Sequence, residues 1–375
     1  MGHMIEMLTK QRELMKEYRF NAMVTMSTEN IAYLIGTPVP SQLTIRSRHV
    51  IVIVPMDQDP VVICVNIEEE LIKNNSWMPA DRVYSYNEFL TDPIVMAAEK
   101  MKELGLDGKR VGIEFNYLPA KDYLTLRQVA PNIEFVNGQD LLDEMRKIKF
   151  QFELDFIEAF GKRAEDVIFS AFEGVHAGST EMDIYRILMQ GFSEIGGEKP
   201  SLIVASGERS SMLNAGPTDR VLKEGDLVRI DLVGTKKGYY CDVCRTAVVG
   251  KPSEEQARIW KIVTGSFDNI VRQLKPGVDT HDIYMDYAKK FKESGYQASI
   301  DFVAHGVGIS CHEEPYINSF KHNILKKDMC MCVEPIYIVP GVGGYQFENE
   351  IFITDDGCRI ISLNRPYHEL PVIRV

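Results

Sequence analysis

The sequence predicts two domains, an α/β domain over residues 1–149 and an α+β domain over residues 150–375. Two observations support this division. The chain has 375 residues, more than the roughly 250–300 that usually share a single hydrophobic core. The pattern of elements also changes near residue 150, where a charged stretch is followed by a long helical segment. The contents of 45% hydrophobic and 26% charged residues are ordinary for a globular enzyme.

The first domain alternates predicted helices and strands, which is typical of an α/β architecture. In its first helix Ile5, Leu8, Leu14 and Met15 lie on one apolar side, and Gly105 ends its second helix. Helices are expected at residues 5–18, 92–104 and 120–129, and strands at residues 22–25, 49–54, 61–65, 110–114 and 133–136.

The second domain begins with a predicted helix over residues 151–177, which His176-Ala177-Gly178 brings to an end. Thr180 is placed to cap the helix that follows. Two more helices are expected at residues 253–274 and 280–294, among several strands. This order indicates an α+β domain and not a regular βαβ repeat.

The overall charge and hydropathy exclude several classes of partner. A net charge of −12 argues against nucleic acid as the main partner, because phosphate binding needs a basic face. No apolar run approaches the roughly 18 residues needed to span a membrane. Glu6 and Lys10 interrupt any apolar core of a signal peptide. We therefore expect a soluble protein with neither a membrane nor a nucleic-acid partner.

The cysteines indicate a reducing compartment. Seven cysteines in a long chain fit free thiols and a cytoplasmic location. Cys241 and Cys244 form a C-x-x-C, but they lie in an apolar, strand-like run and no second pair completes a zinc site. We assign no redox or zinc role to this pair.

Two aspartates form the first candidate site. Asp231 and Asp242 lie on two predicted strands joined by a turn, at equal distances from the midpoint of Lys236 and Lys237. A hairpin that turns at this midpoint places the two carboxylates opposite each other. Because both have apolar neighbours, they repel unless a proton or a cation lies between them.

A histidine followed by glycines forms the second candidate. His305 precedes Gly306 and Gly308, and these glycines would let the backbone pass close to a ligand. His312 follows seven residues later. The alternative for His305 is a buried histidine bonded to a backbone carbonyl.

Two glutamates form the third candidate. Glu334 and Glu348 interrupt apolar, strand-like runs, and their midpoint falls at the turn residue Gly341. A glutamate in such a run is rarely buried without a partner or a metal. Any one of the four acids could be a solvent-facing strand residue, but four acids and a histidine, all in strands, favour a shared site. Their four negative charges would neutralise two divalent cations about 3.5–4 Å apart, and such a pair can activate a water.

These segments resemble the family of methionine aminopeptidase, prolidase and creatinase, which has the "pita-bread" fold. The motifs are D-x10-D, H-G-x-G with a second histidine, V-E-P and F-E-x-x-I. The resemblance extends to residues 27–36, to 146–153 at the start of the second domain, and to Ala205-Ser206-Gly207. It therefore covers nearly the whole chain and implies the two-domain branch, with a creatinase-like first domain and a pita-bread catalytic domain.

The resemblance also implies roles for individual residues. Asp231 and Asp242 would bind one metal, and Asp242, His305 and Glu334 the other, with Asp242 and Glu348 bridging. Glu334 would also be the general base for the bridging water. His312 would contact the substrate carbonyl or stabilise the oxyanion; the alternative is a structural hydrogen bond to a strand. We expect Mn²⁺, and Co²⁺, Fe²⁺ and Zn²⁺ also suit these ligands.

Two positions depart from the family pattern. Asn214 stands where family peptidases carry a histidine before a Pro-Thr, and asparagine cannot shuttle a proton near neutral pH. Gln346 and Asn349 stand where prolidases carry an arginine that helps to hold the substrate carboxylate and an aspartate. These two departures argue against ordinary Xaa-Pro dipeptidase activity.

The sequence thus leads to three hypotheses. The first is a dinuclear metal-dependent hydrolase of a C–N bond in a peptide or amide, similar to an Xaa-Pro dipeptidase or aminopeptidase. The second keeps the metal site but hydrolyses or eliminates a small non-peptide substrate. The third is a catalytically silent binding protein of the same fold. Such proteins usually have lost metal ligands, and this sequence keeps all five. The resemblance also implies a homodimer.

Overall fold

The computed structural model describes residues 2–375. The chain forms two compact units, one ending at Arg146 and one spanning Lys147–Val375. Within the described residues, no helix is both long and apolar enough to cross a membrane.

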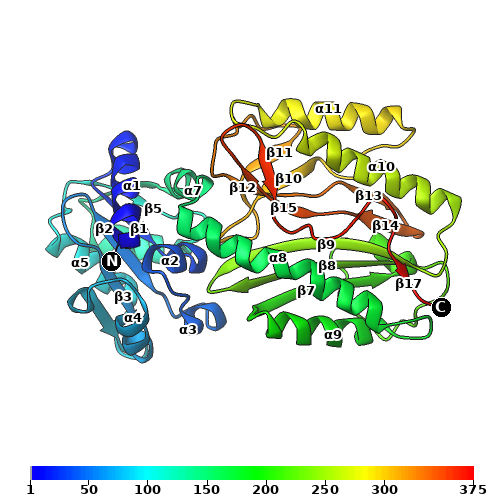
Figure 1. The fold of residues 1–375 in the computed structure, drawn as a ribbon. Helices are drawn as coiled ribbons and strands as arrows, with labels where there is room; N and C mark the ends of the chain where they lie inside the picture. The colour runs from blue at the N-terminus through cyan, green and yellow to red at the C-terminus, as the bar shows by residue number, and fades with distance from the viewer. Residues whose placement is uncertain (1) are drawn as a thin grey trace. The chain divides into compact units, whose positions relative to one another are not determined.

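The first unit is built on a six-stranded mixed sheet with the strand order β4-β3-β2-β1-β5-β6 (Figure 1). β2 runs antiparallel to both of its neighbours, and the remaining pairs are parallel. All residues of β1, β2 and β3 are buried, as expected for strands that helices cover on both faces. The strands are β1 (Ala22–Thr25), β2 (Ile51–Pro55), β3 (Val61–Val65), β4 (Val83–Tyr86), β5 (Arg110–Ile113) and β6 (Glu134–Asn137).

The helices of this unit include the three that the sequence predicts, at α1, α5 and α6. Four helices were not predicted from the sequence, and each has five to nine residues, too short for a clear apolar period. The edge strand β4 was also missed. The helices are α1 (Gly2–Tyr18), α2 (Thr28–Ile35), α3 (Pro40–Thr44), α4 (Glu69–Asn75), α5 (Pro93–Glu103), α6 (Ala120–Val129) and α7 (Gln139–Lys147).

One half of the second unit is a four-stranded sheet with the order β17-β9-β8-β7, against which α8 and α9 pack (Figure 1). Thr180 caps α9 as expected, and Asp183 completes a capping box. α8 ends at Gly174, before the predicted end, because His176 pairs with Arg374 in an extended bridge. These elements are α8 (Gln151–Gly174), α9 (Glu181–Glu194), β7 (Glu198–Ser206), β8 (Leu227–Lys236), β9 (Tyr239–Val249) and β17 (Val372–Ile373).

The other half is a five-stranded sheet with the order β11-β10-β12-β15-β16 and a hairpin of β13 and β14. α10 packs on β14 and α11 packs on β11 (Figure 1). Trp260 and Phe267 of α10 meet Phe347 edge-on in the core. These elements are α10 (Glu254–Val271), α11 (Thr280–Glu293), β10 (Phe302–Gly306), β11 (Glu313–Asn318), β12 (Cys330–Val333), β13 (Ile336–Val339), β14 (Gly343–Gln346), β15 (Asn349–Ile353) and β16 (Cys358–Ile360).

Several apolar clusters support the second unit. One joins α8 and α9 to β8 and β9, a second joins α10 and α11 to β10, β12 and β15, and a smaller one joins α8 to β12 and β15. The polar side chains that the two sheets share lie between these cores. This arrangement can hold charged groups rigidly, because each strand is anchored by its own helices.

Candidate metal centre

The structure brings all five predicted ligands together between the two sheets. Asp231 lies on β8 and Asp242 on β9, His305 lies on β10, Glu334 follows β12 and Glu348 precedes β15. Each of the five is buried, with 1–9% of its surface exposed. The alternative of solvent-facing strand residues is therefore wrong for all four acids.

The register of β8 and β9 differs from the predicted one. Asp231 pairs with Cys244, and Asp242 pairs with Val233, so the aspartates are diagonal neighbours and not directly opposite. The reason is the turn, which is formed by Lys237 and Gly238 with φ values of 49° and 85°. A two-residue turn with positive φ shifts the register from the predicted midpoint. Because the offset is two residues, both carboxyls still lie on one face of the sheet.

The register around the glutamates is the one that the sequence predicts. β13 pairs with β14 as Ile336 with Gln346, and β12 pairs with β15 as Val333 with Asn349. Both pairings follow the same symmetric register about Gly341, whose φ is 73°. Glu334 and Glu348 lie between these two ladders and face the same site.

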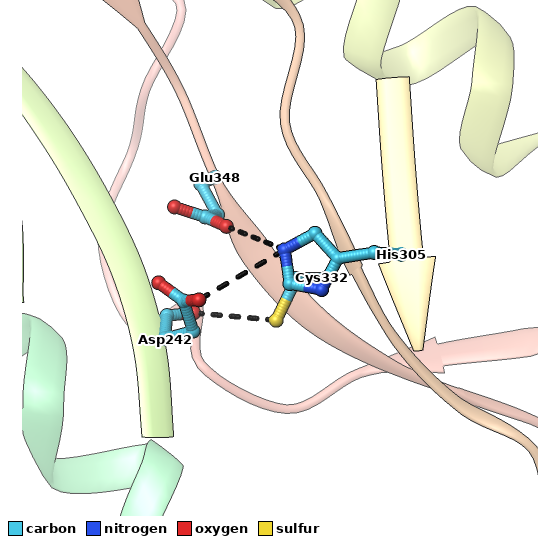
Figure 2. Close-up of side chains that lie close together, drawn as sticks. All are labelled: Asp242, His305, Cys332 and Glu348. Carbon is cyan, nitrogen blue, oxygen red and sulfur yellow. Dashed lines mark hydrogen bonds and ion pairs between the residues drawn. The ribbon is translucent and has the colours of Figure 1, made fainter. Parts of the chain in front are cut away.

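The imidazole of His305 lies at the centre of the cluster (Figure 2). Its Nε2 atom is 3.3 Å from Glu334 Oε1, 3.8 Å from Glu348 Oε1 and 3.9 Å from Asp242 Oδ2. Ligand atoms of Asp242, His305 and Glu348 all lie within 4.8 Å of one another, together with the Cys332 sulfur. The donors thus converge on one small volume.

Several atoms of this cluster have no hydrogen-bond partner among the described residues. They are Asp231 Oδ1, Asp242 Oδ1, His305 Nε2 and Glu334 Oε1, and all four are buried. Buried polar atoms are nearly always paired, so four such atoms around one point indicate a site for a cation. The residues present therefore fit divalent metal ions, because the donor set is oxygen-rich with one imidazole nitrogen.

Burial and mutual repulsion shift the carboxyl groups toward their neutral forms. Burial, followed by the charge of Glu334, raises the pKa of Asp231 to about 6 against the opposing charge of Arg229. Burial and the charge of Asp231 raise the pKa of Asp242 well above its usual range. Burial and the charge of Asp242 do the same to the pKa of Glu348. Only a bound cation would keep all of these groups ionised near neutral pH.

A cavity of roughly 390 Å³ opens onto the cluster. His312 lines this cavity, and its ring stacks on His305 with centroids 3.6 Å apart and planes at 12°. Loss of hydration, followed by the neighbouring His305, lowers the pKa of His312 to about 4, so the ring is neutral at pH 7. Asn214 also lines the cavity. Apolar walls come from Ile203, Leu213, Val233, Ile300, Phe302 and Ile336.

Four residues near the ligands were not predicted as parts of the site. Arg229 and Glu350 lie two residues from Asp231 and Glu348, so a period of two could have placed them on the same strand faces. Cys311 donates to Asp242 Oδ2 at 3.1 Å, and Cys332 lies beside Asp242 and His305 (Figure 2). Cys332 lies two residues before Glu334, so the same period could have placed it, whereas no spacing in the sequence indicates Cys311.

The glycines after His305 allow the chain to pack closely against the start of β11. A Cβ atom on Gly306 would lie 2.5 Å from the carbonyl oxygen of Glu314, and one on Gly308 would lie 2.8 Å from Glu313 Oε1. Both glycines therefore allow the close approach of the residues at the start of β11. They therefore serve close packing beside His305, and the predicted approach of the backbone to a ligand stays a prediction.

Comparison with known proteins identifies the family. Residues 155–355 match metallopeptidase family M24, and residues 7–148 match the creatinase/prolidase N-terminal domain. The chain belongs to family M24. The resemblance and the two-part fold predicted from the sequence are thereby confirmed, and the protein is a metal-dependent peptidase.

Two relatives of this M24 peptidase match nearly its whole length. It is 28% identical over 367 residues to the Xaa-Pro dipeptidase of Pyrococcus horikoshii, which covers 96% of this chain and 98% of that protein. It is 29% identical over 363 residues to the Xaa-Pro dipeptidase of Pyrococcus furiosus, with the same coverage. The crystal structure of the P. horikoshii prolidase superposes with a TM-score of 0.82 at 27% identity, over 96% of this chain and 99% of that one.

The raised pKa values predict how pH affects the stability of this M24 peptidase. A carboxyl whose pKa is raised on folding stabilises the folded state at low pH and ceases to do so as the pH rises through its folded pKa, here about 6 for Asp231. A divalent cation that binds the ionised carboxylates would reverse this loss. We expect the difference in melting temperature between Mn²⁺-loaded and EDTA-treated protein to grow from about pH 5 to about pH 8. Differential scanning fluorimetry measures it, and a difference independent of pH would contradict this account.

Proposed function

We propose that the protein is a dinuclear metal-dependent peptidase that cleaves the Xaa-Pro bond of short peptides. The observation that carries the proposal is a set of four buried side-chain atoms beside the cavity that could bind a metal and have no hydrogen-bond partner among the described residues. Asp231 and Asp242 would hold one cation, and Asp242, His305 and Glu334 the other, with Asp242 and Glu348 bridging. Bound there, two divalent cations supply an activated water and polarise the scissile carbonyl.

The protein's own residues would move the protons. Glu334 Oε1 faces the cluster, so this carboxylate is placed to accept a proton from the attacking water and to pass it to the leaving nitrogen. The neutral ring of His312 lines the cavity and can donate its N–H to the oxygen of the scissile carbonyl as charge develops there. Asn214 can hydrogen-bond the substrate but cannot change its protonation state.

The cavity walls support a small, partly apolar substrate. The volume of roughly 390 Å³ and the walls that include Ile203, Ile300 and Phe302 suit a proline ring beside a short side chain. Two relatives of similar length are named Xaa-Pro dipeptidases. We infer the same bond type for this chain.

A second candidate substrate class has a neutral group in place of the free carboxylate. Apart from its two histidines, the described lining of the cavity has one cationic side chain, Arg229, and each of its three guanidinium nitrogens already donates to the protein. A free carboxylate would therefore find no arginine fork ready to bind it there. This observation favours peptide amides, longer peptides or small non-peptide amides over dipeptides.

A substrate panel separates the two candidates. Purified protein with Mn²⁺ is assayed on an Xaa-Pro dipeptide, on the same dipeptide as its C-terminal amide, and on a peptide with an N-terminal methionine. A higher kcat/KM on the dipeptide supports the first candidate, and a higher value on the amide supports the second. No cleavage of any substrate by protein that holds two Mn²⁺ ions would contradict both.

The replacement of Asn214 by histidine tests the role of this position. The imidazole changes its protonation state near neutral pH, and positioned proton transfer contributes roughly 10²–10⁴-fold in rate. We therefore expect Asn214→His to raise kcat/KM on the preferred peptide by about 100-fold, the lower end of that range. Asn214→Gln is the control, since it keeps an amide; an equal rise with glutamine would contradict the role assigned to the imidazole.

The metal, the assembly and the location are further parts of the proposal. We propose Mn²⁺ as the native ion, a homodimer as the assembly and the cytoplasm as the location. The seven cysteines are all free thiols, which supports a reducing compartment. Elemental analysis of protein purified without added metal tests the ion, and sedimentation velocity tests the assembly.

A further inference from the structure

Arg229 is a buried cation at the edge of the candidate metal centre. Its surface is 0% exposed, and it lies on β8 two residues before Asp231, on the same face of the strand. Its Nη1 atom is 3.9 Å from Asp231 Oδ2. A buried arginine is costly unless its donors are satisfied, so the partners of its N–H groups reveal its role.

The guanidinium group binds two parts of the site. Nη1 donates to the side-chain oxygen of Gln346 at 2.8 Å. Nε donates to the carbonyl of Ser210 at 3.2 Å, and Nη2 donates to those of Met212 and Leu213 at 2.8 and 2.5 Å. The carbonyl partners precede Asn214, which lines the cavity. Arg229 thus links the wall of the cavity to Gln346.

Gln346 in turn bridges two candidate metal ligands. Its Nε2 atom donates to Glu334 Oε2 at 3.1 Å and to Glu348 Oε2 at 3.3 Å. Only one orientation of the amide satisfies all three neighbours, because arginine can only donate and ionised carboxylates can only accept. Arg229 therefore holds the amide oxygen and directs the amide N–H groups toward the glutamates.

The bridge determines which oxygens remain for a cation. Gln346 engages the Oε2 atom of each glutamate, whereas the Oε1 atoms face His305 Nε2 at 3.3 and 3.8 Å. Glu334 Oε1 has no hydrogen-bond partner among the described residues. The two carboxylates are thus held from behind, with one oxygen of each directed to the point where the other donors converge.

We propose that Arg229 is a positioning residue for the metal centre, acting through Gln346 on Glu334 and Glu348. Residues that orient metal ligands in this way typically change metal affinity roughly 10- to 100-fold when they are replaced. The proposal rests on the metal site proposed above. It differs from a purely structural role of Arg229, in which the guanidinium only holds the Ser210–Leu213 segment and Gln346 acts independently.

A double-mutant cycle distinguishes these roles. The single variants Arg229→Lys and Gln346→Leu and the double variant are titrated with MnCl₂ in a calorimeter, after removal of bound metal. We expect each single variant to bind Mn²⁺ about 10-fold or more weakly, and the double variant to bind no more weakly than Gln346→Leu alone. The losses of Mn²⁺ affinity in the two single variants should not add in the double variant. The reason is that the hydrogen bonds from Arg229 reach the glutamates only through the amide of Gln346, which the double variant lacks.

Arg209→Lys is the matched control. Arg209 also binds a backbone carbonyl of the loop that contains Asn214, that of Gly216, and its other partner is Glu181 and not Gln346. We expect this variant to bind Mn²⁺ as the native protein does. Thermal unfolding of all metal-free variants identifies any that fail to fold. In that case the Mn²⁺ affinities of Gln346→Leu and Gln346→Glu are compared in place of the cycle. The Gln346→Glu variant has no amide N–H groups to donate to the two ionised carboxylates.

Three outcomes are informative. Unchanged Mn²⁺ affinity in a folded Arg229→Lys variant would overturn the proposal, and so would losses that simply add in the double variant. Absence of Mn²⁺ binding by the native protein would instead overturn the proposed metal site itself. The steady-state constants give a second readout: loss of orientation lowers kcat at saturating Mn²⁺, whereas loss of the cavity wall alone raises KM.

Discussion

Asp242→Ala is expected to abolish peptidase activity and to weaken Mn²⁺ binding by at least about 100-fold, because replacing residues that merely orient a ligand already costs roughly 10- to 100-fold. Asp242 is 3% exposed, and one of its oxygens lies 3.9 Å from His305 Nε2. Its other oxygen is one of the unpartnered buried atoms. Its removal takes away the carboxylate that would contact both cations.

The measurement has two parts. Bound Mn²⁺ is counted by elemental analysis after gel filtration, and turnover is measured on the best substrate of the panel. Asp356→Ala is the control, because Asp356 is an exposed aspartate in the turn before β16. Full metal content together with full turnover in Asp242→Ala would refute the metal site.

The stability of the Asp242→Ala variant tests the repulsion among the buried carboxyls. Without metal, the buried carboxyls repel one another, and the charge of Asp242 is the largest charge effect on the pKa of Glu348. We therefore expect metal-free Asp242→Ala to melt at a temperature no lower than the metal-free native protein near pH 8. Addition of Mn²⁺ should stabilise the native protein and leave the variant unchanged.

Replacement of His312 is expected to lower kcat while Mn²⁺ binding persists. A donor that stabilises the developing oxyanion contributes roughly 10²–10³-fold to kcat, so we expect losses of this size in His312→Ala. The neutral ring is suited to this donation because its pKa is lowered to about 4. Metal binding should persist because none of the unpartnered buried atoms belongs to His312.

The stacking of His312 on His305 offers a competing explanation, since loss of the ring could simply disturb a metal ligand. His312→Phe separates the two, because phenylalanine keeps an aromatic ring on His305 but has no N–H donor. Loss of activity in both variants supports donation. Retention of activity in His312→Phe, with loss in His312→Ala, would show that His312 acts by stacking only.

The local elements of the fold were largely predictable from the sequence. Long helices such as α8 and α10 show a clear apolar period, and the fully buried strands β1 and β3 are apolar runs between turn residues. Short helices such as α2 and α4 were missed because seven or eight residues carry little periodic signal. The register of β8 and β9 was missed by two residues because it depends on the positive φ of Lys237 and Gly238.

The ligands themselves were recognisable because their chemistry conflicts with their surroundings. Carboxyl groups such as Asp242 and Glu348 interrupt apolar strands, which a folded protein tolerates only with a compensating charge. This conflict is visible in a linear sequence. The symmetric placement of Glu334 and Glu348 about Gly341 was also visible, and the register of the structure agrees with it.

The order of the residues along the chain was thus enough to predict the family, the two-part organisation and the residues that converge as candidate ligands. Only the tertiary structure placed Arg229 against Gln346, which is 117 residues away in the chain, and Cys311 against Asp242, 69 residues away. The apolar pattern of a sequence indicates which face of a single strand or helix is buried, one element at a time. The pairing of donors and acceptors across two sheets depends on how separate cores hold those sheets face to face.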